Sequence, residues 1–576
     1  MAKREKTLSV SAWLLRLGDA LRFSPDEEYA APERERRDYR LIPREKLLTF
    51  KNTVARMREQ SFFVSLGEDF IRELMLTRFR SFSTLFFACG LIQTVSYFVG
   101  SYLPVLSGGQ DNLVLGLILI ALGLVSAFER LGFGALIKRS FLFRRALQPL
   151  LGIADWEIPE GTNREHVWWM LLAGTVLGVL SVAFSLYRVI LWLVLAAAAL
   201  LTLYKPESGL VFTVLLFPFL SSEVTAGLLI LLHLSAWMKI AVGKRTLAPS
   251  PADIPVLVLM AVLLIRGGST GALYALILSV YFLGTHLCRT SFWLRRVSAA
   301  LALSVFIASL AALVARVLAM FAPDAVRLFP GGMAILSTLT GREYVALAVL
   351  LLPELFCLAN AGRRVYVRLF GVVTVLLALV TLAFSRDPGL WLGAGIGLVL
   401  VVALSRRWGF LLCLLTGLGS YTAWKLLPEL VRLRITEFFG LEKSALTAIS
   451  QRLGAGRANL LEALPWGLGS RAAQTVSEGG TVYELAGIFG GWIVLLASAV
   501  VFVWFFVRCM RFSTCPSLGG VHPLVLGAMA GVLVWLVCGL TSPVTGPEPL
   551  FIVFLFLSFP KAAESACDRE EIRQSY

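Results

Sequence analysis

The chain has 576 residues, of which 57% are hydrophobic and only 16% are charged, and its formal net charge is +16. A soluble protein of this size carries roughly 25% charged residues, so the composition excludes an ordinary soluble enzyme or binding module. In a soluble chain such a positive charge would suggest nucleic acid, but in a membrane protein the positive-inside rule explains it, and no nucleic-acid partner is expected. The eight cysteines show no CxxC or zinc spacing, so neither a metal site nor a disulfide framework is predicted.

The N-terminal residues 1–80 form the only long polar block of the sequence. We interpret this block as a basic, amphipathic region on the cytoplasmic side. Within it, the segment SVSAWLLRLGDAL is expected to form a helix that either lies on the inner membrane surface or docks against protein. Its apolar helical face consists of Val10, Trp13, Leu14, Leu17 and Leu21.

From residue 81 onward, apolar runs of about 20 residues recur, and each can cross about 30 Å of hydrocarbon as a helix. Because lipid offers the backbone no hydrogen-bond partners, these runs predict helices rather than open strands. The expected fold is therefore an all-α polytopic membrane protein with about 14–16 transmembrane helices. The sixteen candidate spans begin near Ser81, Asn112, Val167, Arg188, Gly209, Val224, Ile254, Thr270, Val297, Tyr344, Leu369, Gly389, Trp408, Leu485, Pro523 and Leu550.

The distribution of Lys and Arg predicts the orientation of these spans. With the N-terminus inside, the loops predicted to be cytoplasmic carry basic clusters, whereas the opposite loops 104–111, 222–223 and 542–547 carry none. The positive-inside rule then places both termini in the cytoplasm and the long segment 425–484 outside, in a multi-pass membrane protein. The predicted organisation is the region 1–80, two transmembrane helices with a cytoplasmic loop over 81–166, a transmembrane domain over 167–560, and a cytoplasmic tail over 561–576.

Several arginines lie on the side predicted to be extracytoplasmic, against the usual bias. For any one of them, snorkelling to lipid headgroups is a sufficient explanation. As a group beside a large external loop, they favour binding of an anion, most plausibly phosphate, through their forked donors. The candidates for substrate binding are Arg316, Arg342, Arg386, Arg452, Arg457 and Arg471, with Arg188, Arg266 and Arg327 at other outer ends.

Two ionisable residues lie inside predicted spans. His233 in LLILLHLSAW is interpreted as a hydrogen-bonded interior histidine rather than a proton relay. Glu354 in LLLPELFCL is a carboxylate deep in a span, which is a functional hypothesis by default. Its neighbour Pro353 leaves a structural role equally open, because proline frees a backbone carbonyl in a helix.

Four segments, in this order, resemble the O-antigen ligase and O-antigen polymerase superfamily of bacterial envelope proteins. They are YKPESGLVFTVLLFPFL (204–220), DIPVLVLMAVLLI (253–265), FSRDPGLWLGAGIGLVLVVAL (384–404), and GRANLLEALPWGLGSR (456–471) followed by TVYELAGIFGGWIVLL. The resemblance covers about residues 167–560, and the family also has its largest loop outside.

This resemblance implies a membrane glycosyltransferase of polysaccharide biosynthesis. Such a protein holds a polyprenyl-pyrophosphate-linked glycan at the outer face and passes the glycan to an acceptor hydroxyl, without nucleotide, metal or other cofactor. Arg386 matches the arginine of the family's Ser-Arg span, and Arg457 matches the arginine before its Pro-Gly turn. The chemistry needs cations against the leaving pyrophosphate and a group that accepts the hydroxyl proton.

The sequence departs from the family where that proton acceptor is expected. The family has a histidine at the start of the helix after the large loop, and SEGGTVYELAGIFGG has none. The nearby groups able to move a proton are Glu478, Tyr483 and Glu484, which are the candidate catalytic residues.

Two functions therefore remain open. One is a surface polysaccharide ligase or polymerase, and the other is a non-catalytic flippase or transporter of a lipid-linked or anionic substrate. A more distant enzyme alternative, the peptidoglycan polymerase family of shape and division proteins, would need Glu478 or Glu484 as its outer carboxylate. The predicted number of spans exceeds what that family has. The expected partners are membrane lipid, glycan donor and glycan acceptor, and the sequence gives no oligomeric state.

Overall fold

A computed structural model covers the whole chain, and part of it can be described residue by residue. The structure describes residues 72–100, 110–141, 143–144, 148–152, 166–184, 186–241, 250–321, 341–361, 365–385, 387–405, 408–439, 467, 481–513, 522–541 and 546–574. The described part consists mainly of helices, and its one β-bridge pairs Arg78 with Gly132. The prediction of an all-helical chain is confirmed for these residues.

Eleven helical stretches of the described residues are long and apolar enough to cross a membrane. Three shorter apolar helices, within Asn112–Ala127, Leu191–Leu203 and Pro206–Phe219, lie at three further predicted spans. The span predicted near Trp408 is helix α20 (Gly409–Leu426), which is not among the eleven. The described chain thus has the helical, strongly apolar character of a multi-pass membrane protein, with fewer full-length spans than the sequence suggested.

The chain forms two compact units. The first contains residues 1–209, 237–245 and 318–333, and the second contains residues 210–236, 246–317 and 334–576. The full helices of the first unit are α4 (Ser81–Gly100), α5 (Gln110–Ala127), α6 (Phe133–Arg139), α7 (Gln148–Leu151), α8 (Val167–Phe184) and α9 (Leu186–Tyr204).

Small residues bring α4, α5 and α8 of the first unit together. A Cβ at Gly90 of α4 would lie 2.8 Å from the carbonyl oxygen of Gly116 in α5, and one at Gly178 of α8 would lie 2.9 Å from Ile92. Gln93 of α4 also donates a hydrogen bond to Ser181 of α8. Close backbone approach at small residues is how helices associate where lipid tails remove the hydrophobic driving force.

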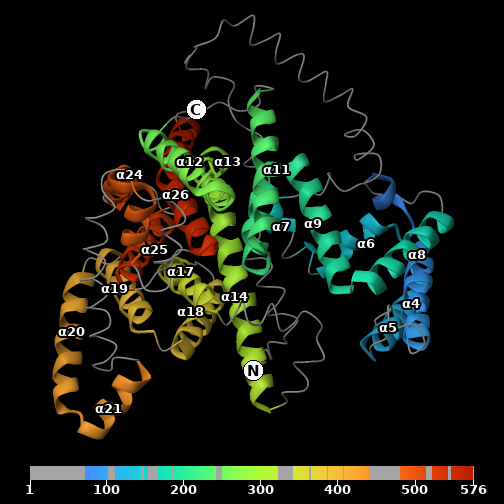
Figure 1. Cartoon of the computed structure of the whole chain (residues 1–576), viewed down its shortest axis with the longest axis horizontal. Helices are drawn as coiled ribbons and strands as arrows, with labels where there is room; N and C mark the ends of the chain where they lie inside the picture. Colours follow the sequence, from blue (N-terminus) through green and yellow to red (C-terminus); the bar gives the residue numbers. More distant parts are fainter. Residues whose placement is uncertain are drawn as a thin grey trace, which may run out of the picture. The chain divides into compact units, whose positions relative to one another are not determined.

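The second unit contains the larger part of the remaining helices, shown in Figure 1 from green to red. The chain adds α10 (Pro206–Leu216), α11 (Ser222–Ala241), α12 (Asp253–Leu278), α13 (Val280–Leu287), α14 (Ser291–Phe321), α17 (Arg342–Ala361), α18 (Val365–Ser385), α19 (Pro388–Ser405), α20, α21 (Glu429–Phe438), α24 (Val482–Ser513), α25 (His522–Thr541) and α26 (Pro547–Gln574). The start of α10 and the ends of α11 and α14 belong to the first unit.

The core of the second unit lies around α17, α25 and α26, the three most buried of the apolar stretches. α17 and α25 run antiparallel, because Gly527 of α25 lies against Glu354 while Gly531 lies against Leu350. α19 packs on α25 where Gly393 meets Cys538 and Val534. The glycines leave room for these close contacts, so the central helices are shielded from lipid on most sides.

Candidate functional site

Two helices of the second unit are interrupted at a glycine. In α12 the break is at Gly268, with φ 56° and ψ −138°, and in α24 it is at Gly491, with φ 64° and ψ −154°. Both backbones lie at positive φ, which glycine adopts without the steric penalty of a Cβ. Each break interrupts the regular series of helical hydrogen bonds and gives the following half-helix its own N-terminus, the positive end of its dipole.

The break in α12 folds the chain back on itself. Asp253 at the start of α12 accepts a hydrogen bond of 3.0 Å from the hydroxyl of Tyr281 in α13. A straight helix over these residues would separate them by about 40 Å, so the two arms form a helical hairpin with its tip at Gly267–Gly268. A Cβ at Gly271 would overlap the carbonyl oxygen of Leu263, which confirms how closely the arms approach. The separate spans predicted near Ile254 and Thr270 are these two arms.

The two breaks lie side by side. A Cβ at Gly267 of α12 would be 2.9 Å from the ring of Phe489, and a Cβ at Gly490 of α24 would be 2.9 Å from Val262. We call Gly267–Gly268 of α12 and Gly490–Gly491 of α24 the paired helix breaks. In a membrane, irregular backbone of this kind is tolerated where it is buried in protein or lines a polar site, and discontinuous helices bind anions at their half-helix N-termini in transporters.

One residue of the predicted external loop contacts the paired helix breaks. Gly467, in LPWGLGSR, has φ 76°, and a Cβ on it would lie 2.7 Å from the backbone nitrogen of Gly491 and 2.8 Å from that of Gly490. Two conditions therefore require glycine at this position, the positive φ and the lack of room for a side chain. The contact joins the loop segment to the break in α24.

A polar, cationic group marks the tip of the α12 hairpin. Arg266, Gly268, Ser269 and Thr270 are all exposed. Arg266 makes no hydrogen bond or ion pair with any described residue, so its guanidinium is available beside the paired helix breaks. Each arm up to the tip has about 14 residues, a length of about 21 Å, which is shorter than the hydrocarbon layer.

A second polar turn lies at the junction of α18 and α19. Asp387 caps α19, because its Oδ1 accepts the backbone N–H of Gly389 at 2.9 Å ahead of Pro388 at the first helical position. The half-buried Arg316 of α14 approaches this junction, with its guanidinium carbon 4.7 Å from the ring centroid of Phe384. The structure thus brings one predicted substrate-binding arginine to the segment that contains Ser385 and Asp387.

Two of the predicted catalytic groups lie in the first turn of α24, and both make structural contacts. Thr481 and Glu484 form a reciprocal capping box, in which Glu484 Oε2 accepts the Thr481 N–H at 3.3 Å and Thr481 Oγ1 accepts the Glu484 N–H at 3.1 Å. The hydroxyl of Tyr483 donates a 2.7 Å hydrogen bond to the carbonyl oxygen of Leu536 in α25. A catalytic role for either residue stays a prediction, and each also has a defined structural role.

The start of α24 and the start of α19 meet at the end of α25. Cys538 of α25 contacts the carbonyl oxygen of Gly389 at 3.6 Å, and a Cβ at Gly539 would lie 3.2 Å from Val482. Two of the segments on which the family resemblance rests, 384–404 and the helix after the loop, are therefore neighbours in space. This convergence could not be obtained from their separation in the sequence.

Five predicted site residues lie outside the described residues, and a sixth is described only by its backbone. The residue described only by its backbone is Arg342, the first residue of α17. The five are Arg386, Arg452, Arg457, Arg471 and Glu478.

Two further sequence features have structural explanations. In YKPESG, which lies in the first unit, Lys205 Nζ donates a 2.9 Å hydrogen bond to the carbonyl oxygen of Gly152, and Glu207 forms a 3.2 Å ion pair with Lys239. This motif fixes the end of α7. His233 lies 2.6 Å from the hydroxyl of Ser279, in agreement with a hydrogen-bonded interior histidine.

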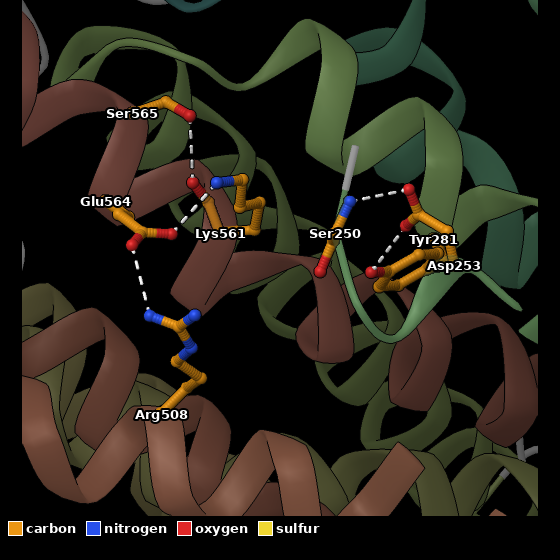
Figure 2. A network of polar contacts seen from close by, with 7 residues as sticks. All are labelled: Ser250, Asp253, Tyr281, Arg508, Lys561, Glu564 and Ser565. Carbon is orange, nitrogen blue, oxygen red and sulfur yellow. Dashed lines mark hydrogen bonds and ion pairs between the residues drawn. The ribbon is translucent and has the colours of Figure 1, made fainter. Parts of the chain in front are cut away.

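A network of charged and polar residues lies at the opposite ends of the two broken helices (Figure 2). Glu564 of α26 accepts from Arg508 of α24 at 3.1 Å and from Lys561 at 3.0 Å. Asp253 of α12, besides contacting Tyr281, accepts the backbone N–H of Ser250 at 2.8 Å. Arg508 is about 17 residues beyond the α24 break, or about 25 Å along the helix, so this network is separate from the paired helix breaks.

No family model, curated protein or solved structure matches this chain. Within the described ranges, no group of His, Cys, Asp and Glu side chains could hold a metal ion. The described residues form a helical protein with many membrane-length apolar helices, in which two interrupted helices and a loop glycine meet next to the chain position of Arg266.

Proposed function

We propose that the protein is a membrane glycosyltransferase-like ligase or polymerase that takes a polyprenyl-pyrophosphate-linked glycan as donor. The observation that carries the proposal is the contact of Gly467 with the paired helix breaks. It joins the loop expected to bind the donor to two half-helix N-termini, which attract anions. On this proposal the pyrophosphate binds at the paired helix breaks, and the lipid tail extends into the surrounding membrane.

One arginine beside this position supports binding of a diphosphate. Arg266 directly precedes one break and is unpaired with any described residue. Arg316, which lies against Phe384 at the α18–α19 junction, is proposed as a second cation for the donor. Guanidinium groups bind phosphate oxygens with two parallel hydrogen bonds. Arg386 and Arg457 are proposed to complete the binding of the leaving group.

In the proposed reaction, the acceptor hydroxyl attacks the anomeric carbon of the donor. The new glycosidic bond forms as the bond to the pyrophosphate oxygen breaks, and the lipid pyrophosphate leaves with that electron pair. The hydroxyl proton passes to a base, for which Glu478 is the proposed candidate, because Glu484 and Tyr483 have structural partners. Cations stabilise the charge that develops on the leaving oxygen.

The proposed setting is the outer face of a bacterial plasma membrane, with both termini in the cytoplasm. The contacts among helix ends support the alternation of spans that this setting requires. The starts of α17 and α26 share one end of the second unit, since Gly546 lies against Glu343, while the network around Lys561 occupies the other end.

The test is glycan transfer by the purified full-length protein in lipid, with a polyprenyl-pyrophosphate-linked glycan and a sugar acceptor. We expect transfer and release of lipid pyrophosphate, with a loss of at least about tenfold in Arg266→Ala, Arg386→Ala and Arg457→Ala, since each removes transition-state charge stabilisation. Arg295→Ala is the matched control, because Arg295 is exposed near the start of α14, at the other end of that helix from Arg316 and outside the donor-binding loop. The proposed enzyme activity would be refuted if neither glycan transfer nor release of lipid pyrophosphate occurred and the three variants functioned like the wild type in cells.

The second candidate is a flippase or transporter for a lipid-linked or other anionic substrate. The specific observation in its favour is again the pair of discontinuous helices, because alternating-access transporters place such helices at the substrate site. In liposomes containing a fluorescent polyprenyl-pyrophosphate analogue, a flippase would make the inner-leaflet pool accessible to a membrane-impermeant quencher added outside, without consuming the lipid. Arg266→Ala would slow this movement, whereas a transferase would release lipid pyrophosphate instead.

A further inference from the structure

The middle of α17 contains a carboxylate that the proposed reaction does not use. Glu354 is fully buried, and neither of its carboxylate oxygens has a hydrogen-bond partner among the described residues. It lies at the centre of the second unit, on one of the most buried apolar stretches of the chain. A carboxylate in such a place is rare in proteins unless it has a function.

The surroundings of Glu354 come from three helices. The hydroxyl of Ser298 on α14 faces the carboxylate, and Gly527 of α25 leaves the space that Oε2 occupies, since a Cβ there would overlap it. The preceding residue, Pro353, packs its ring 2.9 Å from where a Cβ on Gly397 of α19 would be. α14 and α17 run antiparallel here, because Ser298 faces Glu354 whereas Ser309, further along α14, lies 2.9 Å from the hydroxyl of Tyr344, nearer the start of α17.

Among the residues that the structure describes, no charged or titratable group is a counter-ion of Glu354. On its own helix the nearest is the buried thiol of Cys357, one turn further on. On α14 the nearest in sequence to Ser298 is Arg296, whose guanidinium carbon lies 3.5 Å from the ring centroid of Phe292 and 4.8 Å from that of Trp293. The contact positions on α25 and α19 are glycines, which present no ionisable group.

An ionised carboxylate without a partner is far more costly to bury than the neutral acid. A hard metal cation would need several oxygen ligands, and among the described residues the Ser298 hydroxyl is the side-chain oxygen that faces Glu354. A proton requires no further ligand. The geometry therefore favours a carboxyl group that carries its own proton.

We propose that Glu354 is a proton-binding site inside the membrane-spanning bundle, which holds a proton while α14, α17 and α25 are closed around it and releases that proton when water reaches it. On release, the carboxylic acid transfers H⁺ to a water molecule. The products are a carboxylate and a hydronium ion, so the total charge does not change. The proposal rests on the burial of Glu354 and is independent of whether the glycan is transferred or transported.

The test uses dicyclohexylcarbodiimide, which enters lipid and reacts with protonated carboxyl groups. The purified full-length protein in lipid is treated with this reagent alone, and the modified residue is located by mass spectrometry of its peptides. We expect an adduct on Glu354 whose rate of formation falls at least about tenfold between about pH 6 and about pH 10, as the protonated fraction declines. Glu564, which is ion-paired with Arg508 and Lys561, is the internal control and should stay unmodified.

Glu354→Gln is the matched variant, because glutamine has the shape of the protonated acid but carries no exchangeable acid proton. It should fold with the wild-type thermal midpoint, lack the adduct, and lack the carboxyl stretching band that disappears from the wild-type infrared spectrum at high pH. Two results would overturn the proposal: no adduct on Glu354 at any pH, or an adduct and infrared band that do not change with pH. Both measurements are made on wild-type protein, so neither depends on the variant folding.

Discussion

Glu484 illustrates how one residue can suit two roles that sequence cannot separate. In TVYE the carboxylate stands three residues after a threonine, which is the spacing of a capping box, and the structure shows both hydrogen bonds of that motif. The same carboxylate is near the position where a proton acceptor is expected. The burial of Glu484 and its contact with Thr481 give it a structural role whether or not it also contacts a substrate.

Substitutions at Glu484 should separate these roles. Glu484→Ala removes the acceptor of the capping box at the start of α24 and should lower the free energy of unfolding by about 0.3–1.5 kcal/mol, measured by thermal or denaturant unfolding in detergent. Glu484→Gln retains an acceptor oxygen and should keep most of that stability. Equal stability of the alanine and glutamine variants would contradict the capping role, while loss of transfer in a stable glutamine variant would assign Glu484 to the chemistry.

Gly467 is a second residue whose environment is informative, because no side chain fits there. Gly467→Ala would force a Cβ onto the backbone of Gly490 and Gly491 at a positive φ, at a cost of about 1–2 kcal/mol for the conformation alone. We expect a lower thermal midpoint and impaired donor binding. Gly417→Ala is the control, because nothing lies within 4 Å of its added methyl group on α20 and its φ is not positive. Equal behaviour of the two variants would refute the loop contact.

At the scale of elements, the broken helices differ from the rest of the fold. Long apolar helices such as α14 need only continuous backbone hydrogen bonding to cross a membrane, and their positions followed from hydropathy. The fold-back of α12 depends on Gly268 and Gly271, which permit conformations and contacts that other residues would not. The adjacent glycines in RGGST and IFGGW were the available sequence signal.

Two glycines of the hairpin should respond differently to substitution. Gly268→Ala strains the backbone at positive φ but meets open space, whereas Gly271→Ala has no positive φ to strain but drives a methyl group into the Leu263 carbonyl. We expect a loss of about 1–2 kcal/mol for the first and about 3 kcal/mol for the second, at the upper end of the range for overpacking, because the methyl carbon would lie 2.0 Å from the carbonyl oxygen. Thermal unfolding of the two purified variants measures the difference. A greater loss in Gly268→Ala would mean that the arms do not pack as closely as Gly271 indicates.

At the scale of the whole molecule, the orientation in the membrane connects the candidate site with its substrate. The paired helix breaks and the network around Glu564 lie at different ends of α12 and α24, so they should face different compartments. The positive-inside rule assigns Lys561 and Arg508 to the cytoplasm and the loop containing Gly467 to the outside.

Cysteine labelling tests this orientation. In a background without native cysteines, Ser470→Cys should react with a membrane-impermeant maleimide added to intact cells. Ser565→Cys, near the polar network of Figure 2, should react only after the cells are permeabilised. Labelling of residue 470 from the inside alone would invalidate the proposed outer-face site and the proposed function with it.

The sequence by itself determined the helical, membrane-type character of the chain, because apolar runs of spanning length have few other stable forms. Every span predicted from the sequence coincides with a helix, although the sequence did not show which helices are long enough to cross a membrane. The sequence also drew attention to Glu354 and to the PWGLG segment. Only the tertiary structure brought Gly467, Gly267 and Gly490 together and revealed the partners of Glu484 and Tyr483. Hydropathy depends on the chain locally, whereas contacts between distant helices depend on where glycine allows two backbones to approach.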